Sequence, residues 1–272
     1  MKISKKNERE FIKSLKEVGI YLLKIRKKFL KKGKWSKGQY LNRSDKIVDK
    51  LLKKKLKKII DIKIQSEEKI IKINKKKNLY WLIDPIDGTA SYANGFDGFV
   101  TQAALIKNNK TILAGVYAPK KKIMFHAIKG KGAYLNNKKI ITTKNNVIEN
   151  IVDNFKKPYG ITLKIINHFK CKKYIESGSL GLKCCLVAAN KAGVFIKDVY
   201  VKIWDIAPAL LIISESGGCM KDLYGKKITL NKSLLIYGLV VSQTKNQSIK
   251  ILNYLKKNKI RVKKYLNFLD KR

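Results

Sequence analysis

The sequence has few of the residues on which many catalytic and metal sites are built. Its 272 residues include two histidines and four cysteines, and no two cysteines stand in a C-x-x-C spacing. The usual zinc-binding patterns are therefore missing, and we expect reduced thiols in a cytosol. No apolar run approaches the ~20 residues that a membrane-spanning helix needs, and the charged N-terminal stretch lacks the apolar core of a signal peptide. These absences predict a cytoplasmic protein without a membrane partner.

Negative charge is also scarce. Asp and Glu together number 19 against 62 Lys and Arg, which gives a formal net charge of +43, and arginine occurs only five times. A nucleic-acid-binding surface usually combines arginines with aromatic residues on one patch, whereas lysine here recurs along the whole chain among Ile and Asn. We interpret the surplus as a bias on solvated surfaces that would also attract an anionic substrate. Binding to nucleic acid stays possible but is not favoured.

The spacing of apolar residues predicts a chain of mixed α and β structure. Steps of three and four residues predict amphipathic helices over about 11–29 and 47–60, the second capped by Ser44 or Asp45. Short β-like runs separated by turn residues predict a largely antiparallel meander from about 62 to 128. After a polar stretch from about residue 145, the pattern predicts helices at 180–190, 204–216 and around 251–255, and strands at 193–196 and 234–242. We expect one compact unit of two halves, 1–148 and 149–272.

Two aspartates stand where a buried strand ends, in the stretch WLIDPIDGT. Asp84 and Asp87 are joined by Pro85, which fixes φ, and followed by Gly88, which allows a sharp turn. Such a turn can direct two carboxylates and a main-chain carbonyl to one point, and hard divalent cations such as Mg²⁺ prefer oxygen ligands of this kind. The N–H groups of Gly88 and Thr89 could also hold an anion. Taken alone, DPIDGT is also consistent with an Asx-type turn between strands.

Other acidic residues stand at element ends as well. Glu67 and Glu68 close a β-like run, while Asp45 and Asp205 each stand at a predicted helix start, where negative charge is stabilised. Singly, each is explained as a helix cap or a surface acid. Together with the two aspartates of DPIDGT they make six of the 19 acids in the chain, which favours a shared role over six unrelated ones.

The order of these motifs resembles the inositol monophosphatase family of Mg²⁺-dependent, lithium-sensitive phosphatases. The matching residues are Asp45, then Glu67-Glu68, then DPIDGT, then WDIAP at 204–208 followed by ESGG. GVYAPKKKIMFHAIKGKGAYLN and GSLGLKCCLVAANKAGVF also resemble the family's middle strands and second-half helix, so the resemblance covers most of the chain. It implies a layered α-β-α-β-α sandwich of the sugar phosphatase type, with mixed, mostly antiparallel sheets, and often a homodimer.

The resemblance also implies a role for each residue of the site. Two or three Mg²⁺ ions would be ligated by Glu67, Asp84, the Ile86 carbonyl, Asp87 and Asp205, with Asp84 bridging. The catalytic group would be Asp45, Glu67 and Thr89, in which Thr89, backed by Asp45, orients and deprotonates the attacking water. Substrate contacts would come from Gly88, Thr89, Gly178, Ser179 and Asp198. Two ions ~3.5–4 Å apart can activate water and stabilise the leaving oxygen without a protein nucleophile, which suits a chain with two histidines.

Two positions depart from the family pattern. Asn42 stands three residues before Asp45, where the family usually has Thr, which puts one hydrogen bond of the site in question. Pro208 replaces the second Ala of WDxAA, a change that resembles some bacterial members of the bisphosphate nucleotidase type. We expect Pro208 to be tolerated because it lies just inside a helix start, where an N–H has no intrahelical partner.

The resemblance leaves the phosphate ester open. The stretches at 115–119, 178–188 and 207–218 resemble the 3'(2'),5'-bisphosphate nucleotidases, which predicts hydrolysis of adenosine 3',5'-bisphosphate to AMP and phosphate. Against this, residues 90–92 lack the Lys common in bacterial nucleotidases, and Asp198 stands where inositol monophosphatases have an acid that binds ring hydroxyls, unless it is a surface turn acid. The alternatives are an inositol monophosphatase acting on inositol 1-phosphate, and an RNA- or ribosome-associated binding protein on the same fold. We predict the nucleotidase.

Overall fold

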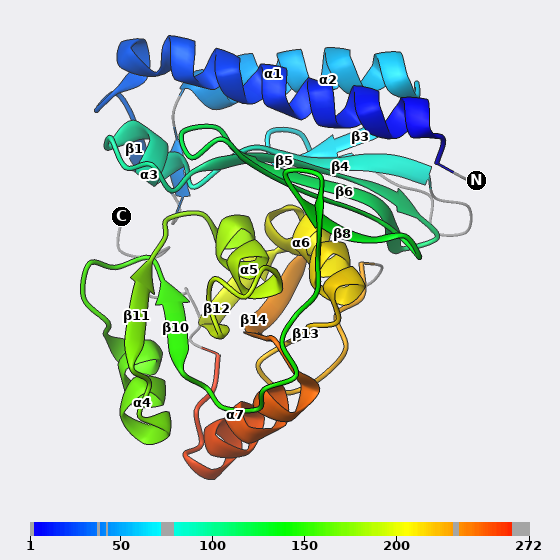
Figure 1. Ribbon diagram of the computed structural model, residues 1–272. Helices are drawn as coiled ribbons and strands as arrows, with labels where there is room; N and C mark the ends of the chain where they lie inside the picture. The colour runs from blue at the N-terminus through cyan, green and yellow to red at the C-terminus, as the bar shows by residue number, and fades with distance from the viewer. Residues whose placement is uncertain (1–2, 37–38, 42, 72–78, 231–233, 263–272) are drawn as a thin grey trace.

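Helices and sheets alternate in five layers in the computed structural model, which describes residues 3–36, 39–41, 43–71, 79–230 and 234–262. Figure 1 shows α1 and α2 over a seven-stranded sheet, α5 and α6 beneath it, then a five-stranded sheet with α4 and α7 on its far side. The helices are α1 (Lys5–Phe29), α2 (Arg43–Ile59), α3 (Thr89–Ala93), α4 (Gly160–Phe169), α5 (Leu180–Ala188), α6 (Ile203–Ser216) and α7 (Lys245–Lys257). The predicted layered sandwich is confirmed.

The first helical layer forms as the apolar spacing predicts. Phe11, Leu15, Val18 and Leu22 of α1 are fully buried against the sheet, and Phe11 stacks on Trp81 with ring centroids 5.5 Å apart. A fully buried side chain of this size contributes about 1.5–3 kcal/mol, so this face holds α1 in place. The helix α2 begins at Arg43, so that its predicted cap is wrong: the candidate residues, 44 and 45, lie within its first turn.

The seven-stranded sheet carries the DPIDGT turn. Its strands are β3 (Ile64–Ser66), β4 (Leu79–Asp87), β5 (Val100–Lys107), β6 (Lys110–Ala118), β7 (Ile123–Ile128), β8 (Gly132–Leu135) and β9 (Lys138–Ile140). The meander from β4 to β9 is antiparallel as predicted, whereas β3 pairs with β4 in parallel. The register of β4 against β5 shifts between Asp84 and Asp87, where Pro85 has no N–H to donate. The strand pairing therefore breaks at the acidic turn.

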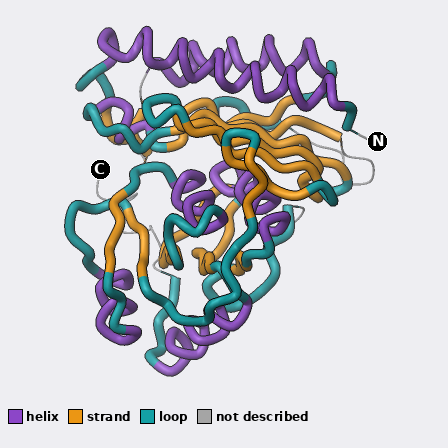
Figure 2. The backbone as a smooth tube through the Cα atoms, viewed as in Figure 1, coloured by secondary structure: helices purple, strands orange, loops and turns teal. Residues whose placement is uncertain are grey.

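The five-stranded sheet is mixed, and part of it was not predicted. Its order is β11 (Lys173–Glu176), β10 (Asn150–Asp153), β12 (Val194–Lys202), β14 (Leu235–Ser242) and β13 (Cys219–Lys221), and β10 runs parallel to both β11 and β12. The polar stretch after residue 145 hides β10, α4 and β11, because the strands have only four residues each and β11 is half exposed. Figure 2 shows the two sheets as separate groups of strands with helices between them.

Two further features complete the fold. A short antiparallel pair, β1 (Lys34–Ser36) with β2 (Gln39–Leu41), lies in the stretch between α1 and α2. Asn42, the first departure from the family pattern, lies outside the described residues. In the part of the chain that the structure describes, no helix is both long enough and apolar enough to cross a membrane.

Candidate active site

The turn that ends β4 brings a threonine hydroxyl to two oxygen atoms. Gly88 adopts a left-handed conformation, with φ of 90°, and α3 begins at Thr89 directly after it. The Thr89 Oγ1 atom then lies 2.9 Å from the Ile86 carbonyl oxygen and 3.0 Å from Asp45 Oδ1 of α2. The Ile86 N–H donates to Asp84 Oδ1 at 3.0 Å, which fixes the Asp84 side chain inside the turn. The structure therefore joins the predicted pair Thr89 and Asp45.

Asp45 is a buried acid with a strongly perturbed pKa. Burial raises its pKa to about 8, and the hydrogen bond from Thr89 opposes this rise while Glu68 and Glu67 add to it. The Oδ2 atom of Asp45 is buried with no hydrogen-bond partner among the described residues. A hydroxyl has one hydrogen, so Thr89 donates either to Ile86 or to Asp45 at any moment. This arrangement lets a proton move between Thr89 and Asp45.

Asp87 is held by the first turn of α5. Its Oδ2 accepts from Ser179 Oγ at 2.6 Å and from the Gly181 N–H at 2.6 Å, and its Oδ1 accepts from the Leu180 N–H at 3.1 Å. Burial raises the pKa of Asp87, and these three hydrogen bonds oppose the rise. Ser179 and its neighbours are thus placed beside the DPIDGT turn, although the Ser179 hydroxyl hydrogen is already directed at Asp87.

The residues around Gly178 leave no free space. A Cβ atom on Gly178 would overlap Ser91 Oγ, and one on Gly98 would overlap the Gly178 nitrogen. The Ser179 N–H donates to the Gly98 carbonyl at 2.5 Å. Glycine at these positions is therefore what allows the start of α5 to reach the segment that follows Thr89.

Asp205 and Glu67 are carried by two different elements, α6 and the end of β3. Asp205 is the third residue of α6 and accepts from the Lys202 N–H at 3.3 Å, and Glu67 directly follows β3. The Lys202 ammonium lies 3.2 Å from Glu67 Oε1 and 5.4 Å from the centre of the Trp204 ring. The Lys202 ammonium thus stands beside one predicted metal ligand, Glu67, and its charge also lowers the pKa of a second, Asp205.

The carboxylates act on one another strongly. Burial is the largest cause that raises the pKa of Asp84 well above its usual value, and the charges of Glu67, Asp87 and Asp205 add to it. Burial likewise raises the pKa of Asp205, followed by the charges of Asp87 and Glu67. Within the described ranges, no three acidic, histidine or cysteine side chains are placed tightly enough to enclose an ion. The donor set, of hard oxygens that repel one another, nevertheless fits a small divalent cation.

Two residues that support this site, Asp49 and Gln102, lie outside the motifs. Asp49, one helical turn after Asp45, accepts from Ser66 Oγ at 2.5 Å, and Ser66 Oγ accepts from the Glu68 N–H at 3.2 Å. Asp49 thereby fixes the turn that carries Glu67, and its spacing of four residues from Asp45 was the available signal. Gln102 of β5 is buried and donates to Asp87 Oδ2 at 3.2 Å, and a polar amide inside an apolar run was the only signal that the sequence offered.

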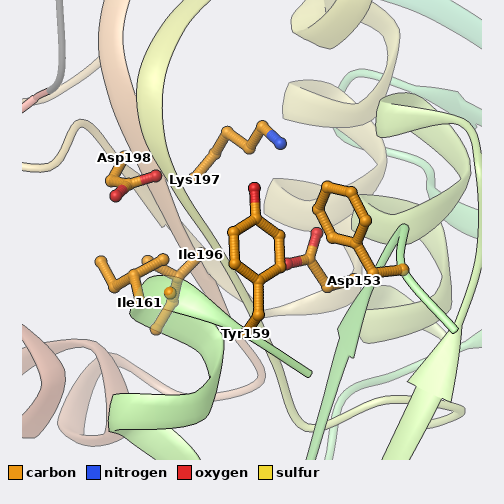
Figure 3. Close-up of a pocket in the computed structure, with 8 residues that line it drawn as sticks. Asp153, Tyr159, Ile161, Ile196, Lys197 and Asp198 are labelled. Carbon is orange, nitrogen blue, oxygen red and sulfur yellow. The ribbon is translucent and has the colours of Figure 1, made fainter. Parts of the chain in front are cut away.

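Asp198 lies beside a small cavity that is lined from three elements. The cavity has a volume of about 30 Å³, and Figure 3 shows Asp198 and Lys197 of β12, Tyr159 at the start of α4, and Asp153 at the end of β10 around it. Ser177 donates its N–H to the Asp153 carbonyl at 2.8 Å, which joins this cavity to the glycine turn before α5. The structure therefore places Asp198 at this cavity together with Asp153, Tyr159 and Lys197.

A model of the inositol monophosphatase family matches residues 9–258. The chain belongs to the inositol monophosphatase family. It is 31% identical to fructose-1,6-bisphosphatase/inositol-1-monophosphatase of Thermotoga maritima over 169 residues, which are 61% of this chain and 64% of that protein. It is 28% identical to Nus factor SuhB of Xylella fastidiosa over 199 residues, 70% of this chain and 71% of that protein. The matched part thus spans slightly less than two thirds of the Thermotoga relative.

Solved structures support the fold of this inositol monophosphatase-family chain. The suhB protein of Bartonella henselae has a TM-score of 0.78 at 22% identity and covers 92% of this chain and 98% of that chain. An IMPase of Thermotoga maritima has a TM-score of 0.75 at 24% identity and covers 91% of this chain and 96% of that chain. At these identities the likeness concerns the fold alone, and it confirms the layered sandwich that the motifs predicted.

Proposed function

We propose that this chain is a Mg²⁺-dependent phosphomonoesterase. The observation that carries the proposal is that acids from four elements lie near one another. The charges of Glu67, Asp87, Asp205 and Asp45 all raise the pKa of Asp84. Holding buried carboxylates near one another destabilises a fold unless a cation or protons compensate them. Family membership favours the cation, and an anionic ester would complete the charge balance.

The predicted ligands fit the chemistry of Mg²⁺. Glu67, Asp84, Asp87, Asp205 and the Ile86 carbonyl supply only oxygen donors, and Ile86 is oriented by the hydrogen bond between its own N–H and Asp84. Bound Mg²⁺ would lower the pKa of a water molecule and neutralise charge on the phosphate and the leaving oxygen. The number of ions, two or three, remains a prediction.

The chain's own residues supply the proton path. The charge of bound Mg²⁺ would lower the pKa of Asp45 and leave its carboxylate ionised. Thr89 Oγ1 can then accept a proton from a water molecule while its own hydrogen passes to Asp45 Oδ1, 3.0 Å away. Before the transfer, the Thr89 hydroxyl can donate instead to the Ile86 carbonyl, 2.9 Å away, which keeps its oxygen in the turn. Gly88 and Thr89 as phosphate contacts, and Ser179 as a substrate contact, remain predictions.

The test is a phosphate-release assay with Mg²⁺ and with EDTA. We expect turnover with Mg²⁺, none in EDTA, and losses of about 10²-fold or more in kcat for Asp87→Asn and Asp205→Asn. Asp61→Asn is the matched control, because Asp61 is a surface acid whose side chain is 79% exposed. Full turnover in EDTA, or wild-type rates from both site variants, would contradict the proposal.

For the substrate we propose an ester with a second anionic group, and adenosine 3',5'-bisphosphate first among these. Lys183 is 2% exposed, and its ammonium lies 3.2 Å from Asn154 Oδ1, which also lies 3.4 Å from the Lys197 ammonium. Two cations thus meet at one amide oxygen beside the cavity of Figure 3. Phe155 and Tyr159, with rings 4.4 Å apart, offer an aromatic edge for a base at the same cavity.

A panel of esters separates the possible substrates. We expect kcat/KM for adenosine 3',5'-bisphosphate to exceed that for inositol 1-phosphate by at least about tenfold, or ~1.4 kcal/mol. Fructose 1,6-bisphosphate belongs in the panel because the Thermotoga relative is named for it. Asp198→Ala should leave the bisphosphates nearly unchanged. A preference for inositol 1-phosphate together with a large Asp198→Ala effect would favour the inositol monophosphatase alternative.

A binding role is the second candidate. The similarity to Nus factor SuhB of Xylella fastidiosa over 70% of this chain, together with the net charge of +43, favours it. RNA affinity that falls steeply with salt and does not change with Mg²⁺ would support binding over catalysis. Homodimer formation, predicted from the family, is to be measured in the same preparations by light scattering.

A further inference from the structure

Gln102 is a fully buried amide in β5 that contacts both aspartate motifs of the site. Its Nε2 lies 3.2 Å from Asp87 Oδ2 and 3.2 Å from the carbonyl oxygens of Trp204 and Asp205. Asp87 ends β4 in the first sheet, whereas Trp204 and Asp205 open α6. Trp204 is 102 residues further along the chain than Gln102. One side chain therefore joins the DPIDGT turn to the start of α6.

Pro208 explains why a carbonyl at the start of α6 is free for this bond. It is the sixth residue of the helix, so the expectation that it replaces an unpaired N–H of the first turn is wrong. In a regular α-helix, the N–H of residue 208 would donate to the carbonyl of residue 204. Proline has no N–H, so the Trp204 carbonyl loses that donor and Gln102 supplies another.

Gly181 provides the space that this amide needs. A Cβ atom on Gly181 would overlap Gln102 Oε1, and Oε1 has no hydrogen-bond partner among the described residues. The amide is thus oriented with its donor atom toward three acceptors and its oxygen against the first turn of α5. Nε2 carries two hydrogens, so it can serve Asp87 and one carbonyl of α6 at the same time.

We propose that Gln102 is a positioning residue that fixes Asp87 relative to the start of α6, and that Pro208 leaves open the carbonyl to which it bonds. The proposal rests on the proposed function, because Asp87 and Asp205 are both among the expected metal ligands. Gln102 is not one of the expected ligands, and it acts through the two segments that carry these carboxylates.

The experiment compares wild type, Gln102→Met, Pro208→Ala and the double variant. Methionine is unbranched and of similar length but cannot donate a hydrogen bond, so it removes the bonds with little change in packing. Melting temperature in EDTA reports stability, and a titration with Mn²⁺ followed by electron paramagnetic resonance reports ion binding without turnover. Release of phosphate gives kcat.

Gln102→Met should melt below wild type, bind Mn²⁺ at least about tenfold more weakly, and lose kcat by a similar factor, the scale of losing a residue that orients a ligand. Pro208→Ala should stay close to wild type in all three. In the double variant, the N–H restored at residue 208 can donate to the Trp204 carbonyl, so the melting temperature should return toward that of Pro208→Ala. Mn²⁺ affinity and kcat should stay low, because nothing then joins Asp87 to α6.

Recovery of Mn²⁺ affinity along with melting temperature in the double variant would overturn the proposal, because Gln102 would then only fill an empty carbonyl. Wild-type Mn²⁺ affinity in Gln102→Met would overturn it as well. If Gln102→Met does not fold, the double variant carries the test alone against Pro208→Ala. If wild type binds no Mn²⁺, the proposed function and the positioning of Asp87 both fail, while the four melting temperatures still decide whether the bond between Gln102 and the Trp204 carbonyl exists.

Discussion

Replacing Asp45 by asparagine should stabilise the protein in EDTA and lower kcat with Mg²⁺ by about 10²-fold. Burial raises the pKa of Asp45 to about 8 in the folded state, against a usual value of 3.8. A raised folded pKa gives stability that is complete below the unfolded pKa and is lost as the pH rises toward the folded pKa. At ~1.4 kcal/mol per pH unit, this amounts to at most about 5 kcal/mol lost between pH 3.8 and pH 7.5. Asparagine avoids this loss because it does not ionise, and it can still bond to Thr89.

The assay is thermal unfolding in EDTA at pH 5.5, 6.5 and 7.5. We expect Asp45→Asn to gain about 2–5 kcal/mol at pH 7.5, or roughly 4–10 °C for a chain of this size, and to gain less at pH 5.5. Asp61→Asn, at an exposed position, should stay within about 0.5 kcal/mol of wild type at each pH. With Mg²⁺, Asp45→Asn should lose about 10²-fold in kcat, the scale of a lost proton acceptor. Equal melting temperatures at pH 7.5, or parallel pH slopes, would refute the reasoning.

Three further changes test other parts of the site and the fold. Thr89→Ala should leave Mn²⁺ binding nearly intact and lower kcat by about 10²-fold, and an unchanged kcat would remove Thr89 from the proton path. Gly98→Ala would press a methyl group on Gly178, so we expect a loss of about 1–3 kcal/mol in urea unfolding together with a lower kcat; a wild-type unfolding midpoint would show that the two glycines are not in tight contact. Burial lowers the pKa of His126, so stability present above pH ~6.5 should be lost as the pH falls below it. His126→Gln should not show that loss, and identical pH profiles of urea midpoints would contradict the assignment.

The acidic residues of the candidate site could be selected from the sequence because each stands near the start or the end of an element. A carboxylate beside a turn-forming proline and glycine is visible without a structure, as in Asp84 to Gly88, and the family resemblance supplied the order of the motifs. The meander from β4 to β9 was predictable for a similar reason, since turn residues separate its apolar runs.

The parts that were missed depend on contacts between distant segments. Gln102 occurs inside an apolar run, and only the structure shows that three acceptors from two segments surround it. Pro208 was expected in the first turn because a sequence locates the start of a helix only to within a few residues. The helix α6 begins at Ile203, which puts Pro208 beyond its first turn. The strands β10 and β11 were not predicted because they are parallel neighbours that pair across an intervening helix. Strands of four residues are also too short to show an alternation of apolar and polar residues.

The hydrogen bonds from the start of α5 to Asp87 determine when during folding the site can form. Ser179, Leu180 and Gly181 lie 92, 93 and 94 residues beyond Asp87, so these bonds close only after a long loop has been drawn together. Contacts of such separation tend to form late, after the local strand pairs of the first sheet. An ion that binds only the finished site should therefore slow unfolding while leaving the folding rate nearly unchanged. In stopped-flow measurements with and without Mg²⁺, only the unfolding rates should change with Mg²⁺. The bound cation would thus give the native state kinetic stability.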